Sequence, residues 1–347
     1  MWPASGRGRK TILAMTPEGS RVVIWVKPEE RERSAMKPSV SVIIPAFNVE
    51  AYLGAAIDSV LEQTQRDVEL IIVDDCSTDG TAEVAGRYQD ARIHVLRNAK
   101  NEGPSQSRNV AIDHATGEWV AILDGDDWWK PRRLEGLLAL AEAHRADIVC
   151  DDLLLVPEGE RNPSVTFFQT QARRLGRIEQ PFEVNALKMA VDDYGFLKPV
   201  FCKAFLNAHA LRYNPALWAG EDFDFLLRCL LASGRMVVSQ EAMYCYRSRP
   251  GSLTSDPVRC LTRIIDMADA LTASLDPRTQ GEVIAAMGRY REWKLRERED
   301  ARFRAPLQKG AWGECMSLAW RNPAKLPRYM PMVGRQLVSL AVSKARR

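Results

Sequence analysis

The sequence predicts an α/β fold built on a mostly parallel sheet, and three observations support this prediction. Apolar runs alternate with amphipathic stretches from Ser39 to Cys150, in the order strand, helix, strand, helix. The runs are short and almost continuously apolar, as expected for strands that are buried on both faces of a sheet. Each is joined to the next by a segment long enough for a crossover helix, so helices are expected on both faces.

The elements can be assigned in chain order from apolar periodicity and from turn residues. Strands are expected at 40–44, 70–73, 93–96, 119–123 and 148–150. Helices are expected at 53–61, 81–88, 105–115 and 131–144, with Pro131 at a favourable first helical position. After an irregular, loop-rich insertion at 158–197, the pattern predicts a helix at 221–233 and short strands at 236–238 and 244–247.

Three regions are expected along the chain. Residues 1–37 have no clear period and are predicted to be a loosely ordered extension, in which the apolar run 22–26 lacks a hairpin partner. Because Met36 stands just before the first convincing strand, the sequence leaves open whether 1–35 belong to the native protein. The α/β domain is expected at 38–256, and a helical, basic C-terminal region at 257–347.

Composition narrows the class of protein. With 46% hydrophobic and 27% charged residues, the chain has the content of an ordinary globular protein. The seven cysteines are scattered and form no C-x-x-C pair, which argues against a zinc site or a disulfide framework and indicates a reducing compartment. No apolar run reaches the ~20 residues that a membrane-spanning helix needs, and no signal peptide is recognisable. We therefore expect a cytoplasmic protein.

Acidic residues follow two of the expected strands, at the edge where open parallel sheets bind ligands. Asp74-Asp75 follows the second strand, and Asp124-Gly125-Asp126-Asp127 follows the fourth. Five carboxylates at one edge repel one another unless a cation or hydrogen-bond donors lie among them. Mg²⁺ and Mn²⁺ prefer such oxygens and typically use one or two carboxylates plus substrate phosphates. The sequence thus predicts a metal–diphosphate site, with solvated acidic turns as the alternative interpretation.

Six ordered motifs resemble those of family 2 glycosyltransferases with the GT-A fold. The matching segments are VIIPAFN at 42–48, IVDDCSTDGT at 72–81, NEGPSQSRN at 101–109, LDGDD at 123–127, GEDFD at 220–224 and YR at 246–247. They extend over roughly Ser39 to Thr254, and their joint order is more specific than any one of them. In size the chain is similar to bacterial exopolysaccharide enzymes of the succinoglycan type. The resemblance implies a Rossmann-like, mostly parallel sheet with helices on both faces, followed by a helical C-terminal region.

The resemblance also implies which residues bind the donor. Pro45, Ala46 and Phe47 would line the nucleotide pocket, and Asp75 would accept a hydrogen bond from the uracil ring. Arg108 would lie near the nucleotide or diphosphate, and Asp124 would contact the ribose. Asp126 would hold the Mn²⁺ or Mg²⁺ ion that bridges the two phosphates.

A closing loop is implied at Arg247, which would contact the donor. The family often has a histidine two residues further on, where this chain has Arg249. Arginine can contact phosphate oxygens with two parallel hydrogen bonds, but it does not titrate near neutral pH. At this position the sequence therefore departs from the family, because a histidine able to contact a metal is replaced by arginine.

The Glu221-Asp222 pair opens an expected helix, where carboxylates are favoured by the helix dipole. That electrostatic effect alone is the structural interpretation of the pair. The resemblance instead implies that Asp222 is the general base for the acceptor hydroxyl and that Glu221 orients the acceptor, although either carboxylate fits the base role. A single in-line displacement would invert the anomeric carbon.

The basic charge of the C-terminal segment indicates where the protein meets its acceptor. From Ala301 to Arg347 there are ten lysines and arginines against one acidic residue, a net charge of +9. With tryptophans interspersed, this segment is typical of a peripheral contact with an anionic membrane surface, here the inner face of the plasma membrane. A basic helix packed on the catalytic domain is the equally weighted alternative. No nucleic-acid-binding motif accompanies the charge.

The sequence therefore predicts transfer of a sugar, with glucose from UDP-glucose as the working choice, to a lipid-linked oligosaccharide in exopolysaccharide synthesis. A metal-dependent phosphatase or nucleotidyltransferase is a rival interpretation, but the chain has no phosphate-binding P-loop and no dinucleotide motif. A non-catalytic nucleotide-sugar-binding scaffold is a second rival. The joint presence of Asp126, Asp222 and Arg247 argues against it, because a scaffold needs no base.

Overall fold

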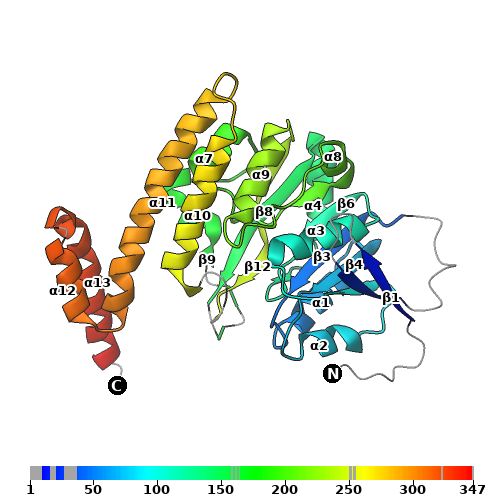
Figure 1. Ribbon diagram of the computed structural model, residues 1–347, viewed down its shortest axis with the longest axis horizontal. Coiled ribbons are helices and arrows are strands. Elements are labelled where there is room, and N and C mark those ends of the chain that lie inside the picture. Colours follow the sequence, from blue (N-terminus) through cyan, green and yellow to red (C-terminus); the bar gives the residue numbers. More distant parts are fainter. Residues whose placement is uncertain are drawn as a thin grey trace. The chain divides into compact units, whose positions relative to one another are not determined.

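The chain forms two compact units, Met1–Ser252 and Leu253–Arg347 (Figure 1). The computed structural model describes residues 10–15, 21–26, 37–157, 159–160, 162–163, 165–249, 252, 255–321 and 323–345. Among the helices in these ranges, none is long and apolar enough to cross a bilayer.

The described strands of the first unit form one mixed, twelve-stranded sheet. Its centre is a parallel set in the order β5 (Ile93–Asn98), β4 (Val68–Asp74), β3 (Val40–Ala46) and β6 (Trp119–Ile122). The short β11 (Val200–Cys202) lies antiparallel between β6 and β8 (Ile148–Val156). Beyond it, β12 (Met236–Arg247) runs parallel to β8. Three short strands complete this half of the sheet: β10 (Phe182–Val184) and β7 (Trp128–Trp129) on β12, and β9 (Val165–Thr166) on β8.

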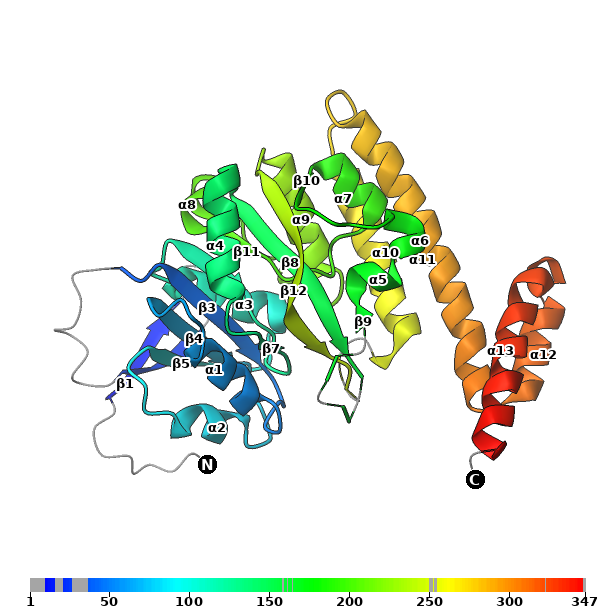
Figure 2. The same cartoon turned by 180° about the vertical axis from the view of Figure 1, so that it is seen from behind.

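Helices cover both faces of this sheet, as the sequence predicts (Figures 1 and 2). In the order of the chain they are α1 (Leu53–Leu61), α2 (Thr81–Arg87), α3 (Pro104–His114), α4 (Arg133–His144), α5 (Phe167–Thr170), α6 (Ala172–Leu175), α7 (Ala186–Asp192), α8 (Lys203–Ala208) and α9 (Glu221–Leu231). Because both faces are covered, consecutive residues of the central strands are buried, with Ile43, Ile44 and Leu70 fully so.

The expected strands and helices of the α/β segment are present, except that α4 begins at Arg133, so Pro131 lies in the turn before the helix and not at its first position. Three regions contain more structure than predicted. The insertion at 158–197 contains β9, α5, α6, β10 and α7 instead of loops alone. The two short strands expected at 236–238 and 244–247 are one long β12, which shifts register between Val238 and Tyr244. A bulge of this kind interrupts the apolar period, so the sequence pattern divides one strand into two.

Part of the N-terminal segment is paired. β1 (Lys10–Met15) and β2 (Arg21–Val26) form an antiparallel pair, and β2 adds to the sheet beside β5. The run 22–26 therefore has a hairpin partner that the sequence pattern did not reveal. An open strand edge offers unpaired N–H and C=O groups, and this pairing satisfies them along β5. The rest of 1–36 lies outside the described residues.

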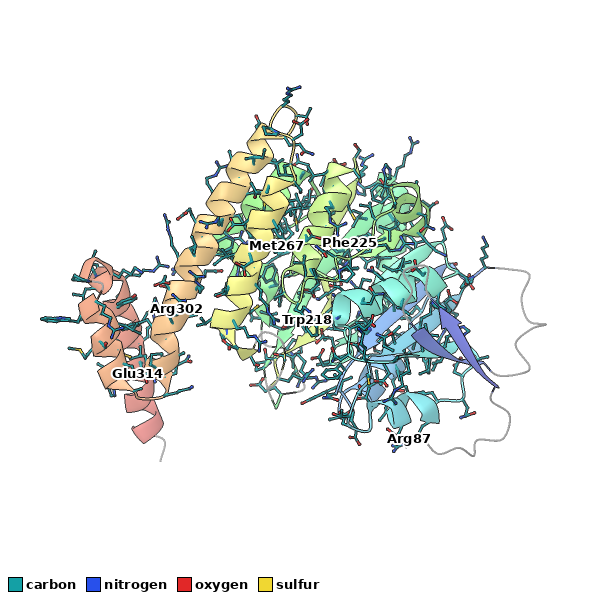
Figure 3. All side chains as sticks on the ribbon, in the orientation of Figure 1. Arg87, Trp218, Phe225, Met267, Arg302 and Glu314 are labelled. Carbon is teal, nitrogen blue, oxygen red and sulfur yellow. The ribbon has the colours of Figure 1, made fainter. Side chains whose placement is uncertain are left out.

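The second unit is helical, as expected. It contains α10 (Pro257–Ala273), α11 (Gly281–Gln308), α12 (Trp312–Arg321), a 3-10 turn at Pro323–Lys325 and α13 (Leu326–Ala345). The helices α10 and α11 lie side by side (Figures 1 and 2), and Met267 of α10, labelled in Figure 3, is buried. At its other end α11 packs against α12 and α13 around Phe303, whose ring stacks on Tyr329 with centroids 3.9 Å apart.

Candidate active site

The predicted site residues follow strands that end at one edge of the sheet. The ends of β3 and β4 are joined there, because the Asp75 backbone N–H donates to the Ala46 carbonyl at 2.8 Å. β6 runs parallel to β3 on its other side and leads into Asp124. The loop after β4 and the loop after β6 therefore emerge at the same edge, where ligands bind in sheets of this type.

Five charged side chains from four segments meet at this edge, and we call them the charge cluster: Arg108, Asp124, Lys198, Glu221 and Asp222. The Arg108 guanidinium contacts Asp124 at 2.8 Å, Glu221 at 2.9 Å and Asp222 at 3.3 Å. The Lys198 ammonium lies 2.9 Å from Asp124 and 2.6 Å from Asp222. Two cations thus hold three carboxylates together in a region almost closed to water.

The electrostatics of the charge cluster keep both cations charged. Burial alone would lower the pKa values of Arg108 and Lys198, but the surrounding carboxylates outweigh it and raise both well above their usual values. Burial also opposes ionisation of Asp124, yet Lys198 and Arg108 more than reverse this and hold its pKa far below its usual range. For Glu221 the balance differs, since burial and then Asp222 raise its pKa against the two cations.

Local sequence explains why Glu221 and Asp222 point into the cluster. Gly220 adopts a left-handed conformation, with φ at +79°, and so ends the preceding loop where α9 begins. The apolar side of α9 is buried, and Phe225 stacks on Tyr213 with ring centroids 4.1 Å apart. The Tyr213 ring in turn lies under the Arg108 guanidinium at 5.1 Å. The packing of α9 therefore orients its first turn towards Arg108.

Asp126 lies beside the closing-loop arginines. Its carboxylate accepts a hydrogen bond from Arg249 Nε at 2.5 Å, and its backbone carbonyl accepts one from Arg247 Nε at 2.9 Å. Arg247 also lies 4.4 Å from the centroid of the Trp128 ring and 5.2 Å from that of Tyr52. Pro250 and Gly251, which follow Arg249 in the chain, lie outside the described residues.

Asp127 has a different environment from Asp126. Its two carboxylate oxygens accept from the Tyr244 hydroxyl at 2.8 Å and from the Arg247 backbone N–H at 2.7 Å. Burial, followed by the charges of Asp126 and Asp124, raises its pKa well above the usual value. Asp127 therefore joins the loop after β6 to the end of β12 and fixes the position of Arg247.

The residues at this edge fit a divalent ion that binds together with a diphosphate. Within the described ranges, no three His, Cys, Asp or Glu side chains are grouped so that they could hold a metal ion by themselves. Asp126, whose side chain is 18% exposed, offers a carboxylate at the surface of the site. One carboxylate completed by phosphate oxygens and water is a usual arrangement for Mg²⁺, and Mn²⁺ accepts the same oxygens.

On the nucleotide side, Asp75 is buried and already accepts three hydrogen bonds. They come from Asn98 Nδ2 at 2.7 Å, from the Glu102 backbone at 2.9 Å and from the Gly103 backbone at 2.8 Å. A carboxylate has about four acceptor positions, so roughly one is left for a ligand N–H. Gly103 has φ at +86°, and a Cβ there would lie 3.3 Å from the Trp218 ring, which Figure 3 labels.

The three residues proposed to line the nucleotide pocket differ in exposure. Pro45 is half-buried, the Ala46 methyl group is buried, and the Phe47 ring is 42% exposed. Ala46 can therefore offer mainly its backbone to a ligand, whereas the Phe47 ring is available to contact a base.

Sequence reasoning missed one member of the charge cluster, Lys198. It precedes β11 in Leu197-Lys198-Pro199, outside the quoted motifs. The only signal was a lysine between an apolar residue and a proline at the start of a short apolar run. Arg108 was expected near the nucleotide or diphosphate, and its guanidinium contacts three protein carboxylates in this structure.

Comparison with known proteins supports the same interpretation of the sequence. The model of a family described as "Glycosyl transferase family 2" matches residues 41–195. The succinoglycan biosynthesis protein ExoO of Rhizobium meliloti is 35% identical over 219 residues, which are 62% of this chain and 63% of ExoO. The chain therefore spans less than two thirds of that relative.

Two further relatives are matched over a larger share of their length. The putative glycosyltransferase EpsE of Bacillus subtilis is 43% identical over 219 residues, 60% of this chain and 73% of EpsE. The succinoglycan biosynthesis protein ExoU of Rhizobium meliloti is 29% identical over 304 residues, 85% of this chain and 86% of ExoU.

Two solved structures are similar in fold. S. aureus TarS 1–349 in complex with UDP-GlcNAc has a TM-score of 0.61 and 21% identity, over 83% of this chain and 92% of that one. The mannosyltransferase PcManGT from Pyrobaculum calidifontis, in complex with GDP-Man and Mn²⁺, has a TM-score of 0.58 and 19% identity. That match covers 89% of this chain and 87% of PcManGT.

Proposed function

This chain belongs to glycosyltransferase family 2 and has the GT-A fold, and from this premise we propose that it transfers a sugar from a nucleotide diphosphate-sugar to a hydroxyl group. The observation that carries the proposal is the convergence of Asp124, Asp126 and Asp222 at one sheet edge. They belong to segments separated by about 100 residues, and Arg108 and Lys198 join the first of them to the last.

The proposed donor is a UDP-sugar, with UDP-glucose as the first to test. Asp75 would accept from the uracil ring through its remaining acceptor position, while Phe47 and Pro45 line the pocket and Asp124 contacts the ribose. Support for a uridine nucleotide comes also from TarS, whose complex contains UDP-GlcNAc. The choice of glucose rests only on the family resemblance.

Charge on the departing diphosphate would be balanced by cationic groups at this edge. A Mn²⁺ or Mg²⁺ ion held by Asp126 would supply Lewis-acid stabilisation of that leaving group. Arg247, fixed by its stacking on Trp128, and Arg249, already beside Asp126, would contact the phosphate oxygens. These groups lie at the site before the reaction, so little reorganisation is needed when charge develops.

Asp222 is the proposed general base, and Glu221 the residue that orients the acceptor. Asp222 would take the proton from the acceptor hydroxyl as that oxygen attacks the anomeric carbon, which gives inversion. Lys198 and Arg108 stay protonated beside it and therefore do not compete for the proton.

The proposed acceptor is a lipid-linked oligosaccharide of exopolysaccharide synthesis, reached at an anionic membrane surface. The outer side of α12 supports this location, because Trp312, Met316 and Trp320 follow at every fourth position and are exposed, Trp320 by 86%. Leu326, Met330 and Leu337 of α13 are also exposed large apolar side chains. Aromatic and aliphatic residues next to Arg321 suit the interfacial layer of a bilayer.

The charge of this region is less one-sided than the sequence suggests. Lys325 pairs with Glu299 at 2.9 Å, and Arg328 pairs with Asp300 at 2.5 Å. Part of the basic surplus is therefore neutralised by α11 within the same unit. The proposed membrane contact consequently depends on the exposed apolar side chains as much as on charge.

A donor screen tests the enzymatic proposal. Labelled nucleotide-sugars are incubated with the full chain, Mn²⁺ and a membrane extract, beside the Asp222→Asn variant. We expect one UDP-sugar to label a lipid-extractable product and the variant to lose at least about a hundredfold in rate, since general bases contribute that much or more. Full transfer by the variant would remove Asp222 as the base. UDP binding without transfer of any sugar would favour the scaffold.

Vesicle flotation tests the membrane contact. We expect the chain to float with phosphatidylglycerol vesicles, and a Trp312→Ser/Trp320→Ser variant to bind roughly tenfold more weakly. Arg278→Ala is a matched control, because this exposed residue lies in the turn between α10 and α11. Unchanged flotation of the double tryptophan variant would refute the proposed surface.

A further inference from the structure

Lys198 is a buried lysine held between two carboxylates of different segments. Its side chain is 8% exposed, and its ammonium contacts Asp124 and Asp222 at 2.9 and 2.6 Å. Lysine is almost never buried unless it is paired, so its position in the fold is specific. The motifs of the family resemblance assign no role to this residue.

The backbone around Lys198 is fixed from two sides. Its carbonyl accepts a hydrogen bond from Arg133 Nη2 at 2.6 Å, and Arg133 is itself held by a buried contact with Asp151 at 2.7 Å. On the other side, a Cβ at Gly195 would lie 2.6 Å from the Phe223 Cβ. Glycine at this position lets the segment pass close to the first turn of α9, which carries Asp222.

The contacts of Lys198 and Arg108 form a closed ring with Asp124 and Asp222. Arg108 contacts the Oδ1 atom of each aspartate, and Lys198 contacts the Oδ2 atom of each. Each carboxylate is therefore held through both oxygens, with one oxygen bound by each cation. Removal of either cation frees a carboxylate to rotate about its terminal torsion, which is a broad and weakly restricted one.

We propose that Lys198 is a positioning residue that aligns the base Asp222 with the donor by tying it to Asp124. The proposal rests on the proposed function, in which Asp124 contacts the donor and Asp222 activates the acceptor. Lys198 remains protonated and moves no proton. Its effect is geometric, since a base displaced by about 1 Å can cost roughly a hundredfold in rate.

A purely charge-neutralising role gives different expectations. If Lys198 only balanced the charge of the carboxylates, any cation of similar size would replace it. The reduction in rate caused by removing Lys198 would then add to the reduction caused by removing Asp222. If Lys198 acts through the orientation of Asp222, arginine is a poor substitute because its larger planar guanidinium cannot place one nitrogen between the two Oδ2 atoms as the Lys198 ammonium does. In that case its removal has no further effect once the base is gone.

The test measures UDP release from the best donor, with the membrane extract of the donor screen as the source of acceptor, and UDP affinity in Mn²⁺, both with the full chain. We expect Lys198→Met to release UDP about a hundredfold more slowly, with UDP affinity within about threefold of the parent. Lys198→Met in the Asp222→Asn background should be no slower than Asp222→Asn alone. Lys188→Met is the control, because it removes a lysine–aspartate pair with Asp192 on α7, outside the charge cluster.

Lys198→Arg keeps the inference testable if the methionine variant does not fold. We expect this variant to unfold at a temperature close to that of the parent and to turn over about tenfold more slowly. Parental turnover by Lys198→Arg, or additive losses in the double variant, would overturn the positioning role. If the parent chain releases UDP from no nucleotide-sugar, the proposed function itself fails, and that result is separate from any behaviour of Lys198.

Discussion

Both units contain ion pairs between lysine or arginine and aspartate or glutamate. The distances are nearly equal in the two units, but the exposure of the side chains to water differs. In the charge cluster of the first unit, Arg108 and Lys198 are 3% and 8% exposed. In the second unit, Lys325 and Arg328 contact Glu299 and Asp300 at 2.9 and 2.5 Å while 37% and 39% exposed. Distance alone therefore does not distinguish the two sets of ion pairs.

The difference in burial determines what each set can do. Exposed pairs contribute little, because water screens them and long side chains lose freedom when they pair. A buried cluster loses the hydration of every charge, so its net contribution to stability is small even though breaking it is costly. We infer that the charge cluster is retained for the chemistry at the sheet edge, whereas the pairs of the second unit help α13 to pack on α11.

The largest expected effect is on stability when one cation leaves the charge cluster. Arg108→Met leaves three mostly buried carboxylates with Lys198 as the remaining cation of the cluster, and we expect the free energy of unfolding to fall by about 3–5 kcal/mol. Denaturant unfolding of the full chain measures this change. The control is Arg212→Met, which removes a pair with Asp113 at 2.9 Å with both side chains almost 30% exposed. Equal losses in the two variants would contradict the role given to burial.

The pair between Arg249 and Asp126 is an intermediate case, with side chains 16% and 18% exposed. Arg249 occupies the carboxylate that would bind the metal, and its charge repels a second cation. We expect Arg249→Gln to bind free Mn²⁺ about tenfold more tightly than the parent, which is about 1.4 kcal/mol. Addition of UDP should raise the Mn²⁺ affinity of this variant less than it raises that of the parent. Electron paramagnetic resonance of Mn²⁺ measures both. Weaker binding of free Mn²⁺ by the variant would contradict this account.

The same contrast explains how much could be predicted from sequence. β3 and β4 were predictable because burial on both faces requires an apolar residue at nearly every position, as at Ile43 and Ile71. The position of Asp124 and Asp126 at the sheet edge was predictable because parallel strands end at one edge. In each case the signal lies within a few neighbouring residues.

Lys198 and the hairpin of β1 and β2 could not be predicted in this way. Lys198 acquires its role from Asp124 and Asp222, which are 74 and 24 residues away in the sequence, and its own neighbours carry no motif. The strand partner Lys10–Met15 is recognisable only once the open edge of the sheet beside β5 is known. Pairings that depend on tertiary contacts leave little trace in local periodicity.

Glu221 and Glu299 should give pH dependences of opposite sign. Burial and Asp222 raise the pKa of Glu221, so the folded state binds more protons and this contribution to stability falls as pH rises above about 4.5. The hydrogen bond from Lys325 lowers the pKa of Glu299, so its contribution is present above about 4.5 and is lost as pH falls.

The change of unfolding temperature with pH, from about pH 4 to pH 8, tests these two pH dependences. Relative to the parent, Glu221→Gln should gain in stability as pH rises, because it no longer has to bury an ionised carboxylate. Glu299→Gln should be less stable than the parent at neutral pH, and this difference in stability should shrink as pH falls. Parallel curves for the parent and both variants would show that neither carboxyl group titrates differently in the folded state.

The smallest expected effect is at Arg328. Arg328→Ala removes the contact with Asp300 and a hydrogen bond to the Arg296 carbonyl at 3.0 Å, yet leaves Asp300 able to regain water. We expect a loss of about 0.5 kcal/mol, reduced further by salt, because exposed pairs seldom contribute more than about 1 kcal/mol. Denaturant unfolding at low and high ionic strength measures it. A loss as large as that of Arg108→Met would mean that burial is not what separates the two units, and the functional reason inferred for the charge cluster would lose its basis.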